Sequence, residues 1–288
     1  MSPTPAPRTP PTPAIASDED RPFIEFAGVR KAFGAKVIYE DLTLRVRRGE
    51  TLTILGGSGS GKSVMLKLLI GLLSADSGSI RFDGQELTGL SEEALLPVRR
   101  RISMLFQGGA LFDSISVGEN VAYPLREHFR LSESELRERV GKKLAQVGLP
   151  GIEHMRPAEL SGGMRKRVAI ARAIAADPEV LLYDEPTTGL DPINTRRINE
   201  LIRSIQRDLH VTSLVVTHDM ASAFMVSDRM AMLSDRRIRA TLPREEFRRS
   251  SDPAIHDFVH AMSEQAQDAH DRTEPADPVT AQPKGGSR

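Results

Sequence analysis

One eight-residue stretch, Gly56–Ser63, constrains the fold of this chain more than any other part of the sequence. It runs Gly-Gly-Ser-Gly-Ser-Gly-Lys-Ser, between the apolar run Thr51–Leu55 and the apolar segment 64–73. Strand, glycine-rich loop and helix in this order match the pattern G-x-x-x-x-G-K-[S/T], in which backbone N–H groups at a helix N-terminus surround phosphate oxygens. The stretch therefore predicts a phosphate-binding loop.

The residues of this loop suit a phosphate group and a divalent cation. Lys62 is placed to reach the β- and γ-phosphates of a nucleotide, and the Ser63 hydroxyl is a ligand for Mg²⁺. The plainer alternative is a glycine-rich turn with an incidental lysine, which the flanking strand and helix make weak. The other binding candidates in the loop are Gly56, Gly57, Ser58, Gly59, Ser60 and Gly61.

Short apolar runs alternate with helical patterns along the rest of the chain. Runs that are apolar on both faces are typical of buried parallel strands. One helical pattern follows the loop, and another, 164–176, stops before Asp177-Pro178, where proline prevents its continuation. The alternation predicts an α/β fold. The predicted strands are Thr51–Leu55, Ile102–Phe106, Val180–Tyr183 and Leu214–Val216.

The segment 117–157 breaks this alternation, because it contains no convincing strand. It contains an amphipathic helix instead, with Ser132 and Glu135 as a candidate capping box and Gly148 as its end. We expect a helical insertion that forms a small second lobe. The alternative is an ordinary long crossover connection. The apolar face of the helix consists of Leu136, Val140, Leu144 and Val147.

Two adjacent carboxylates, Asp184 and Glu185, directly follow the predicted strand Val180–Tyr183. The carboxyl ends of parallel strands form the edge at which ligands bind in open α/β sheets. At that edge Asp184 is placed to hold Mg²⁺ and Glu185 to polarise an attacking water. The alternative is a solvated strand end, but apolar residues that lead straight into two charges favour a site.

Four further residues are candidates for contact with a nucleotide. Gln107 and His218 lie at or just beyond the ends of predicted strands, where they would contact the metal and the γ-phosphate. Asp191 lies shortly after the acidic pair. Phe33 is placed to stack on a base, or alternatively to pack in the core.

A second helix start carries the sequence Ser161-Gly162-Gly163. Ser161 is a good N-cap, and the two glycines permit close approach of another backbone. Taken alone, the motif indicates only a well-capped helix. The chain has only one nucleotide loop, however, and this second helix N-terminus is also suited to a phosphate. We therefore expect it to contact a phosphate that is bound by another copy of the chain.

Composition limits the classes of protein to which the chain can belong. Lysine plus arginine equal aspartate plus glutamate at 39 each, so no long-range field attracts nucleic acid. The absence of cysteine excludes disulfides and thiolate metal sites. No apolar run approaches the roughly 20 residues that cross a bilayer, and no secretory signal is evident, so we expect a soluble cytoplasmic chain.

Two basic clusters and one histidine pair are weaker signals. The clusters 99–101 and 165–167 are predicted to be ordinary surface charge, although the second lies near the Ser161 helix start and could reinforce anion binding. His256 and His260 have a spacing that suits a metal. Because no third ligand is evident nearby, we favour a solvated helix face.

In their order along the chain, these motifs resemble those of the ATP-binding cassette (ABC) ATPases. The resemblance covers residues 22–248, and its Leu-Ser-Gly-Gly sequence is specific to that family among P-loop proteins. The matching segments are Phe33 (A-loop), Gly56–Ser63 (Walker A), Gln107 (Q-loop), 160–164 (signature motif), Asp184-Glu185 (Walker B), 189–192 (D-loop) and His218 (H-loop).

The resemblance implies a P-loop, RecA-like core, an antiparallel β-subdomain and a helical subdomain at about 110–165. A helical extension at 249–262 would follow, and the proline-rich segment 1–21 and the polar segment 263–288 are expected to be disordered tails. The implied ligands are ATP and Mg²⁺. The implied catalytic residues are Lys62, Gln107, Glu185 and His218, and the implied metal ligands are Ser63, Gln107 and Asp184.

The family also implies two chains that sandwich two ATP molecules. In that arrangement Ser161 and Gly163 of one chain complete the site of the other.

A narrower resemblance, to the ATPase subunits of the Mla/MCE phospholipid and sterol transporters, rests on segments 104–112, 117–127 and 162–173. Most importer ATPases have glutamine where Met164 stands and proline in the segment of Asp113. The implied partners are an integral membrane permease, a periplasmic MCE-domain protein and in some systems a STAS-domain subunit, with no nucleic acid. The implied location is the cytoplasmic face of the bacterial inner membrane, as a peripheral subunit.

Three alternatives in function remain open at this point. The first alternative is an ATPase subunit that energises the import of an amino acid or another small solute. The second is a soluble ABC ATPase that works without a membrane. A P-loop kinase is the third alternative, but it leaves Ser161 and His218 without a role.

Overall fold

The computed structural model describes residues 21–256 and 258. Except for Arg21, the tails predicted at 1–21 and 263–288 lie outside these residues, as does His260 of the histidine pair. Of the helical extension predicted at 249–262, residues 253–256 are helical, and most of the remainder lies outside the described part.

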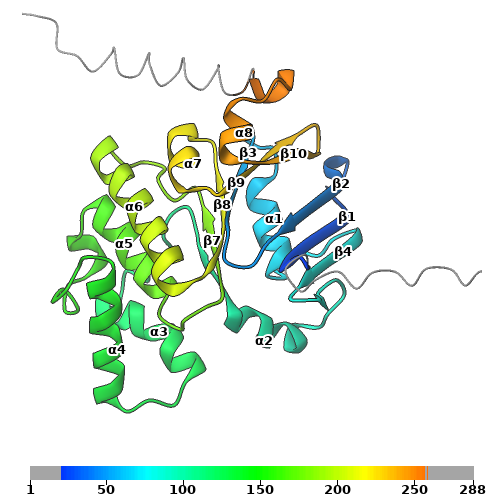
Figure 1. The fold of residues 1–288 in the computed structure, drawn as a ribbon. Helices are drawn as coiled ribbons and strands as arrows, with labels where there is room; N and C mark the ends of the chain where they lie inside the picture. Colours follow the sequence, from blue (N-terminus) through cyan, green and yellow to red (C-terminus); the bar gives the residue numbers. More distant parts are fainter. Residues whose placement is uncertain (1–20, 257, 259–288) are drawn as a thin grey trace, which may run out of the picture.

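A six-stranded sheet forms the centre of the molecule (Figure 1). Its strand order is β10-β9-β3-β8-β7-β6, with β10 antiparallel to β9 and all other neighbours parallel. The four predicted strands lie side by side in it, which confirms the predicted α/β class. The strands are β3 (Thr51–Leu55), β6 (Ile102–Leu105), β7 (Val180–Asp184), β8 (Thr212–Thr217), β9 (Arg229–Ser234) and β10 (Arg237–Pro243).

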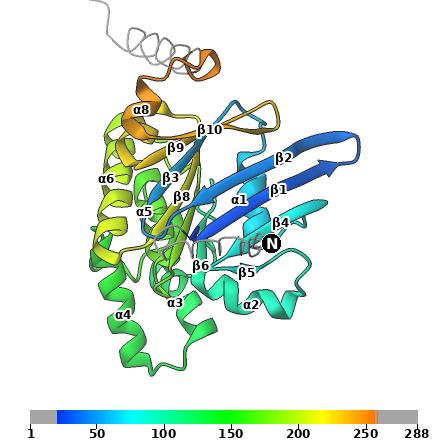
Figure 2. The same ribbon diagram turned by 45° about the vertical axis from the view of Figure 1, so that its right-hand side comes forward.

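A second, antiparallel sheet has the order β2-β1-β4-β5. Its long β1–β2 hairpin lies beside helix α1 (Figure 2). This sheet is the antiparallel β-subdomain that the family resemblance implies. Its strands are β1 (Ile24–Phe33), β2 (Lys36–Val46), β4 (Ser77–Phe82) and β5 (Gln85–Glu86).

The central sheet is buried on both faces, because its side chains alternate between two cores. Leu182 packs in a core with α1 (Lys62–Leu69) and the antiparallel sheet. Its neighbours Leu181 and Tyr183 pack in a second core, with α5 (Gly162–Ala173) and α6 (Pro192–Leu209). This alternation explains why the predicted strands are apolar along their whole length.

The segment 117–157 contains two helices, α3 (Val117–His128) and α4 (Glu133–Gln146), which pack against each other and against α5. The predicted capping box is present at the start of α4, where Ser132 and Glu135 each cap the other's backbone. Helix α3 was not predicted from the sequence. Its signal is obscured by Pro124, which lies inside the helix.

Three further helices lie elsewhere along the described part of the chain. They are α2 (Glu92–Arg101), α7 (Met220–Val226) and α8 (Arg244–Arg248). Within the described ranges, 21–256 and 258, every helix is too short or too polar to cross a lipid bilayer.

Candidate functional site

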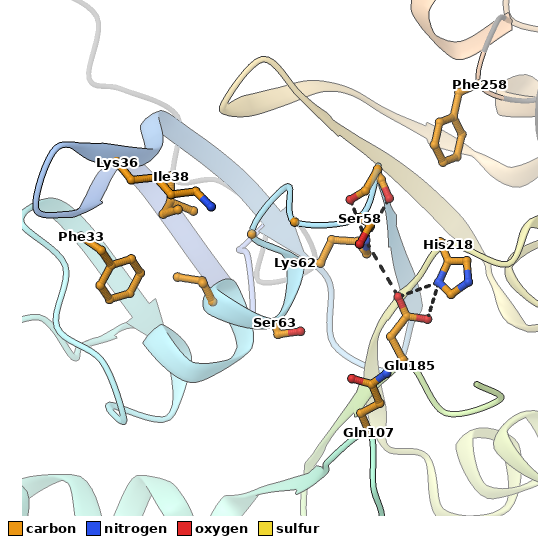
Figure 3. A pocket seen from close by; sticks show the side chains of 15 residues that line it. Phe33, Lys36, Ile38, Ser58, Lys62, Ser63, Gln107, Glu185, His218 and Phe258 are labelled. Carbon is orange, nitrogen blue, oxygen red and sulfur yellow. Dashed lines mark hydrogen bonds and ion pairs between the residues drawn. The ribbon is translucent and has the colours of Figure 1, made fainter. Parts of the chain in front are cut away.

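A cavity of about 810 Å³ lies at the carboxyl end of β3, between the phosphate-binding loop and the ends of neighbouring strands. Figure 3 shows side chains from both sheets and from the C-terminal segment around it. It is lined by Phe33, Lys36, Ile38, Gly56, Gly57, Ser58, Gly59, Gly61, Lys62, Ser63, Val64, Gln107, Glu185, His218 and Phe258.

The start of α1 is open towards this cavity. Gly61, the N-cap residue, has φ +106°, and no side chain caps the helix. A Cβ at Gly61 would lie 2.5 Å from Ile38 Cγ2, so both the backbone angle and the available space require glycine. The uncapped N–H groups and the positive end of the helix dipole together favour a bound anion.

Lys62 is 7% exposed and points into this region. Its ammonium donates to the carbonyl oxygens of Gly56 at 2.9 Å and Gly57 at 3.1 Å, and lies 3.9 Å from Glu185 Oε1. Burial lowers the pKa of Lys62, although the nearby Glu185 and Asp184 carboxylates oppose this effect. The two carboxylates compensate the charge of this ammonium only in part. Phosphate oxygens bound in the cavity would supply the rest of the negative charge.

Ser63 and Asp184 present a pair of oxygen ligands. The Ser63 hydroxyl donates to Asp184 Oδ1 at 2.7 Å, and Asp184 is buried. Burial raises the pKa of Asp184, and the charge of Glu185 adds to that effect, while the bond from Ser63 opposes it. A buried carboxylate next to a hydroxyl is the kind of oxygen donor set that suits Mg²⁺, whose charge would stabilise the ionised form of Asp184.

The Glu185 carboxylate is held from several directions. His218 Nδ1 lies 3.0 Å from Oε1 and 2.9 Å from Oε2 (Figure 3). The hydroxyls of Thr188 and Thr217 each donate to Oε2 at 3.2 Å. These contacts fix a carboxylate at the cavity wall, where it can accept a proton from a water held beside it.

The backbone of Glu185 is strained. Its φ of +49° lies in the left-handed region, which non-glycine residues rarely adopt. Such strain costs on the order of 1 kcal/mol or more and persists only where the surroundings over-determine it. The Glu185 N–H donates to Val216 O at 2.9 Å, which ties the residue to the end of β8.

The structure brings together most of the site residues predicted from sequence. Phe33 is 46% exposed at the edge of the cavity, so it is not a core residue, and the Lys31 ammonium lies 5.1 Å from the centroid of its ring. Gln107 lines the cavity below Glu185 (Figure 3). Ser60 is different, because it borders a neighbouring cavity of about 380 Å³ next to Asp235.

Ser161, Gly162, Gly163 and Asp191 do not line the cavity of their own chain. Ser161 is exposed and caps α5 by accepting from Met164 N–H at 3.2 Å. Asp191 is also exposed and caps α6. A Cβ at Gly163 would lie 2.7 Å from the Asn194 side chain, so the two helix starts pack closely together.

Four residues that line the cavity, and one buried residue behind it, were not predicted from the sequence. Val64 directly follows the phosphate-binding loop, whereas no motif marks the other three, Lys36, Ile38 and Phe258. Lys166 was expected to be surface charge, and this prediction was wrong because Lys166 is only 7% exposed. Its spacing of three from Gly163 and four from Ile170, both buried, places it on the buried face of α5 and was the available signal.

Comparison with known proteins decides the family. The model of the ABC transporter family matches residues 39–188, which is more than half of the chain.

The chain belongs to the ABC transporter family.

Two relatives match most of the chain. The Mycobacterium tuberculosis (strain ATCC 25618 / H37Rv) protein named probable ribonucleotide transport ATP-binding protein mkl is 44% identical, over 88% of this chain and 74% of its own length. The Haemophilus influenzae protein named intermembrane phospholipid transport system ATP-binding protein MlaF is 43% identical, over 84% of this chain and 92% of its own length.

Solved structures agree with this assignment. The cassette MJ0796, solved as a dimer in a post-hydrolysis state with ADP and phosphate, has a TM-score of 0.71 and 31% identity over 77% of this chain and 98% of its own. The cbiO1 protein of Clostridium perfringens has a TM-score of 0.73 and 28% identity over 88% of this chain and 96% of its own. This ABC transporter chain is thus an ATP-binding and ATP-hydrolysing cassette.

Proposed function

We propose that this cassette hydrolyses Mg-ATP as a homodimer and thereby drives a separate membrane permease that moves phospholipid or a related lipid. The observation that carries the proposal is the meeting of Lys62, Ser63, Glu185 and His218 at one cavity. Opposite charges and a carboxylate held for proton transfer are what phosphoryl transfer to water requires, since the reaction needs positioning and charge stabilisation more than covalent help.

Each residue has a distinct task in this proposal. Phe33 stacks on the adenine, the N–H groups of the phosphate-binding loop bind the phosphates, and Lys62 stabilises charge on the γ-phosphate. Glu185 accepts the proton of the attacking water, and His218 keeps the Glu185 carboxylate in position. Ser63, Asp184 and Gln107 would hold Mg²⁺, which offsets the phosphate charge when bound.

A second copy of the chain completes each site in this proposal. Ser161 and Asp191 are exposed at two adjacent helix starts and are separate from the cavity of their own chain. An uncovered helix start suits a phosphate bound by another chain. The dimeric state of the solved cassette MJ0796 supports this arrangement.

An aromatic pair next to the Gln107 loop suits the permease. Phe112 is 44% and Tyr123 47% exposed, and their rings lie 5.1 Å apart between centroids. Exposed aromatic pairs are typical of docking sites for a partner protein. A cassette docked in this way lies on the cytoplasmic face of the bacterial inner membrane. By family resemblance, a periplasmic MCE-domain protein joins the same assembly, as does a STAS-domain subunit in some systems.

The catalytic part of the proposal is tested with Glu185→Gln, which keeps the shape of the side chain but removes the base. We expect ATP binding within about twofold of the wild type and hydrolysis reduced by at least about 10²-fold. Saturating Mg-ATP should then produce a long-lived dimer in sedimentation velocity. Full hydrolysis by this variant, or a strict monomer at saturating Mg-ATP, would contradict the proposal.

The lipid part is tested separately, because the names of the relatives disagree. Native membranes would be solubilised with the affinity-tagged cassette, and the co-purified proteins and lipids identified by mass spectrometry. We expect an integral permease together with bound phospholipid. Recovery of a permease for ribonucleotides, amino acids or sugars would overturn the lipid assignment and leave the ATPase assignment intact.

A further inference from the structure

Lys166 is a buried cation with no task in the mechanism above. It lies on α5, five residues after the Ser161 cap, and is 7% exposed. Its ammonium donates to the main-chain carbonyl oxygen of Gln107 and lies 3.5 Å from that of Glu185. These two residues follow β6 and β7, which are neighbouring parallel strands.

The two carbonyl groups belong to the residues on which hydrolysis depends. Gln107 and Glu185 both line the cavity, and each lies just beyond the end of its strand. Glu185 also has the left-handed backbone angle that neighbouring groups must stabilise. The bond from its N–H to Val216 O holds one side of this residue, and Lys166 holds the other.

We propose that Lys166 is a positioning residue that couples α5 to the active site by holding the main chain of Gln107 and Glu185 at a fixed separation. This inference rests on the proposed role of Glu185 as the base. A buried ammonium can donate up to three hydrogen bonds and is costly to leave unpaired, so it keeps both carbonyl groups together.

The position of Lys166 on α5 links the start of this helix to the two carbonyl groups. The start of α5 at Ser161 is the end that would meet the ATP of a second chain. Lys166 is about 6 Å further along the helix, at 1.5 Å of rise per residue from Gly162. A shift of α5 when its start binds a partner's phosphate would therefore be passed directly to the peptide groups of Gln107 and Glu185.

The test compares Lys166→Met, which removes the donor but keeps the length of the side chain, with Lys166→Arg, which restores a donor and its charge. The matched control is Lys143→Met. Lys143 is also a buried lysine, but it lies on α4 and pairs with the carboxylate of Asp177. Steady-state ATPase kinetics and hydrogen–deuterium exchange of peptides spanning 102–110 and 180–190 would be measured on the full chain.

For Lys166→Met we expect kcat to fall at least about tenfold with the KM for ATP within about twofold, because a misplacement of about 1 Å can cost 10²-fold in rate. Exchange in both peptides should become faster in this variant but not in Lys143→Met. Lys166→Arg should recover at least half of kcat. These results would support a positioning role.

Wild-type kcat and exchange in Lys166→Met would overturn the inference. If Lys143→Met lost as much kcat and as much melting temperature as Lys166→Met, the inference would also be overturned, because Lys166 would then contribute only to overall stability. The Glu185→Gln result separates the two proposals: if that variant is inactive while Lys166→Met is normal, only the positioning role fails.

Discussion

At the scale of single residues, the site is built from charges that burial makes unfavourable until a ligand arrives. Burial lowers the pKa of Lys62 and raises the pKa of Asp184. The charged form of each group is therefore less stable in the protein than the charged form of the same group in water. Phosphate oxygens would stabilise the first and a divalent cation the second. Binding of the two ligands together is therefore favoured electrostatically.

Lys62→Ala tests the phosphate-binding half of this pair. The lysine is a preorganised positive charge, and removal of one such group typically costs about 10² to 10³ in rate. We expect a loss of that size in kcat/KM for ATP, measured by phosphate release. Because the substitution also removes a desolvated charge, the ligand-free protein should keep its melting temperature within a few degrees. Unchanged ATPase activity would show that Lys62 does not contact the nucleotide.

At the scale of elements, the antiparallel sheet contains a carboxylate that makes it sensitive to acid. Burial acts to raise the pKa of Glu86, but hydrogen bonds from Ser79, Thr88 and the Ile80 N–H outweigh this effect and lower the pKa to about 2. Arg81 lies 3.2 Å from the same carboxylate. The β4–β5 turn is therefore tied to the ionised form of Glu86.

Glu86→Gln tests this dependence. The folded pKa of about 2 lies below the ordinary value of 4.5, so Glu86 contributes stability above pH 4.5 that is lost as the pH falls towards 2. After allowance for solvent exposure, we expect the variant to be less stable by on the order of 1 kcal/mol at pH 7. This difference should shrink as the pH falls from 5 to 3 in urea titrations. A difference that is constant with pH would contradict the assignment.

At the scale of the whole molecule, the helix starts at Ser161 and Asp191 are exposed, and the cavity of the same chain does not include them. A site made from two chains accounts for this separation. The chain has no cysteine, so single cysteines can be introduced without background reactivity.

Cross-linking between two variants tests the two-chain site. Chains carrying Ser58→Cys and chains carrying Ser161→Cys, both with Glu185→Gln, would be mixed and treated with a short bifunctional thiol reagent. We expect a covalent dimer on denaturing gels only when Mg-ATP is present, because the nucleotide brings the two positions together.

The matched control replaces Ser161→Cys with Ser134→Cys, on the first turn of α4. This control should give no ATP-dependent dimer. Equal cross-linking with and without ATP, or equal cross-linking of the control, would contradict a nucleotide sandwiched between Ser58 of one chain and Ser161 of the other.

Local sequence patterns specify much of the order of the elements along the chain. They predicted the strand, loop and helix around Gly56–Ser63, the acidic pair at the end of β7, and the N-caps of α4 and α5, whereas α5 ends at Ala173 and not at the predicted residue 176. These features depend on residues close together in the chain, through glycine conformation, N-cap hydrogen bonds and alternating apolar side chains. The helix α3 was missed because Pro124 masks its local pattern.

The contacts between residues far apart in the sequence depend on the packing of the elements in three dimensions. His218 and Glu185 are 33 positions apart, and their contact depends on β7 and β8 being neighbours in the sheet. Lys166 resembles an ordinary surface charge in its local sequence, and it is buried because α5 packs that face against the ends of β6 and β7. Burial and contact between distant segments arise from the packing of whole elements, and local patterns carry little information about that packing.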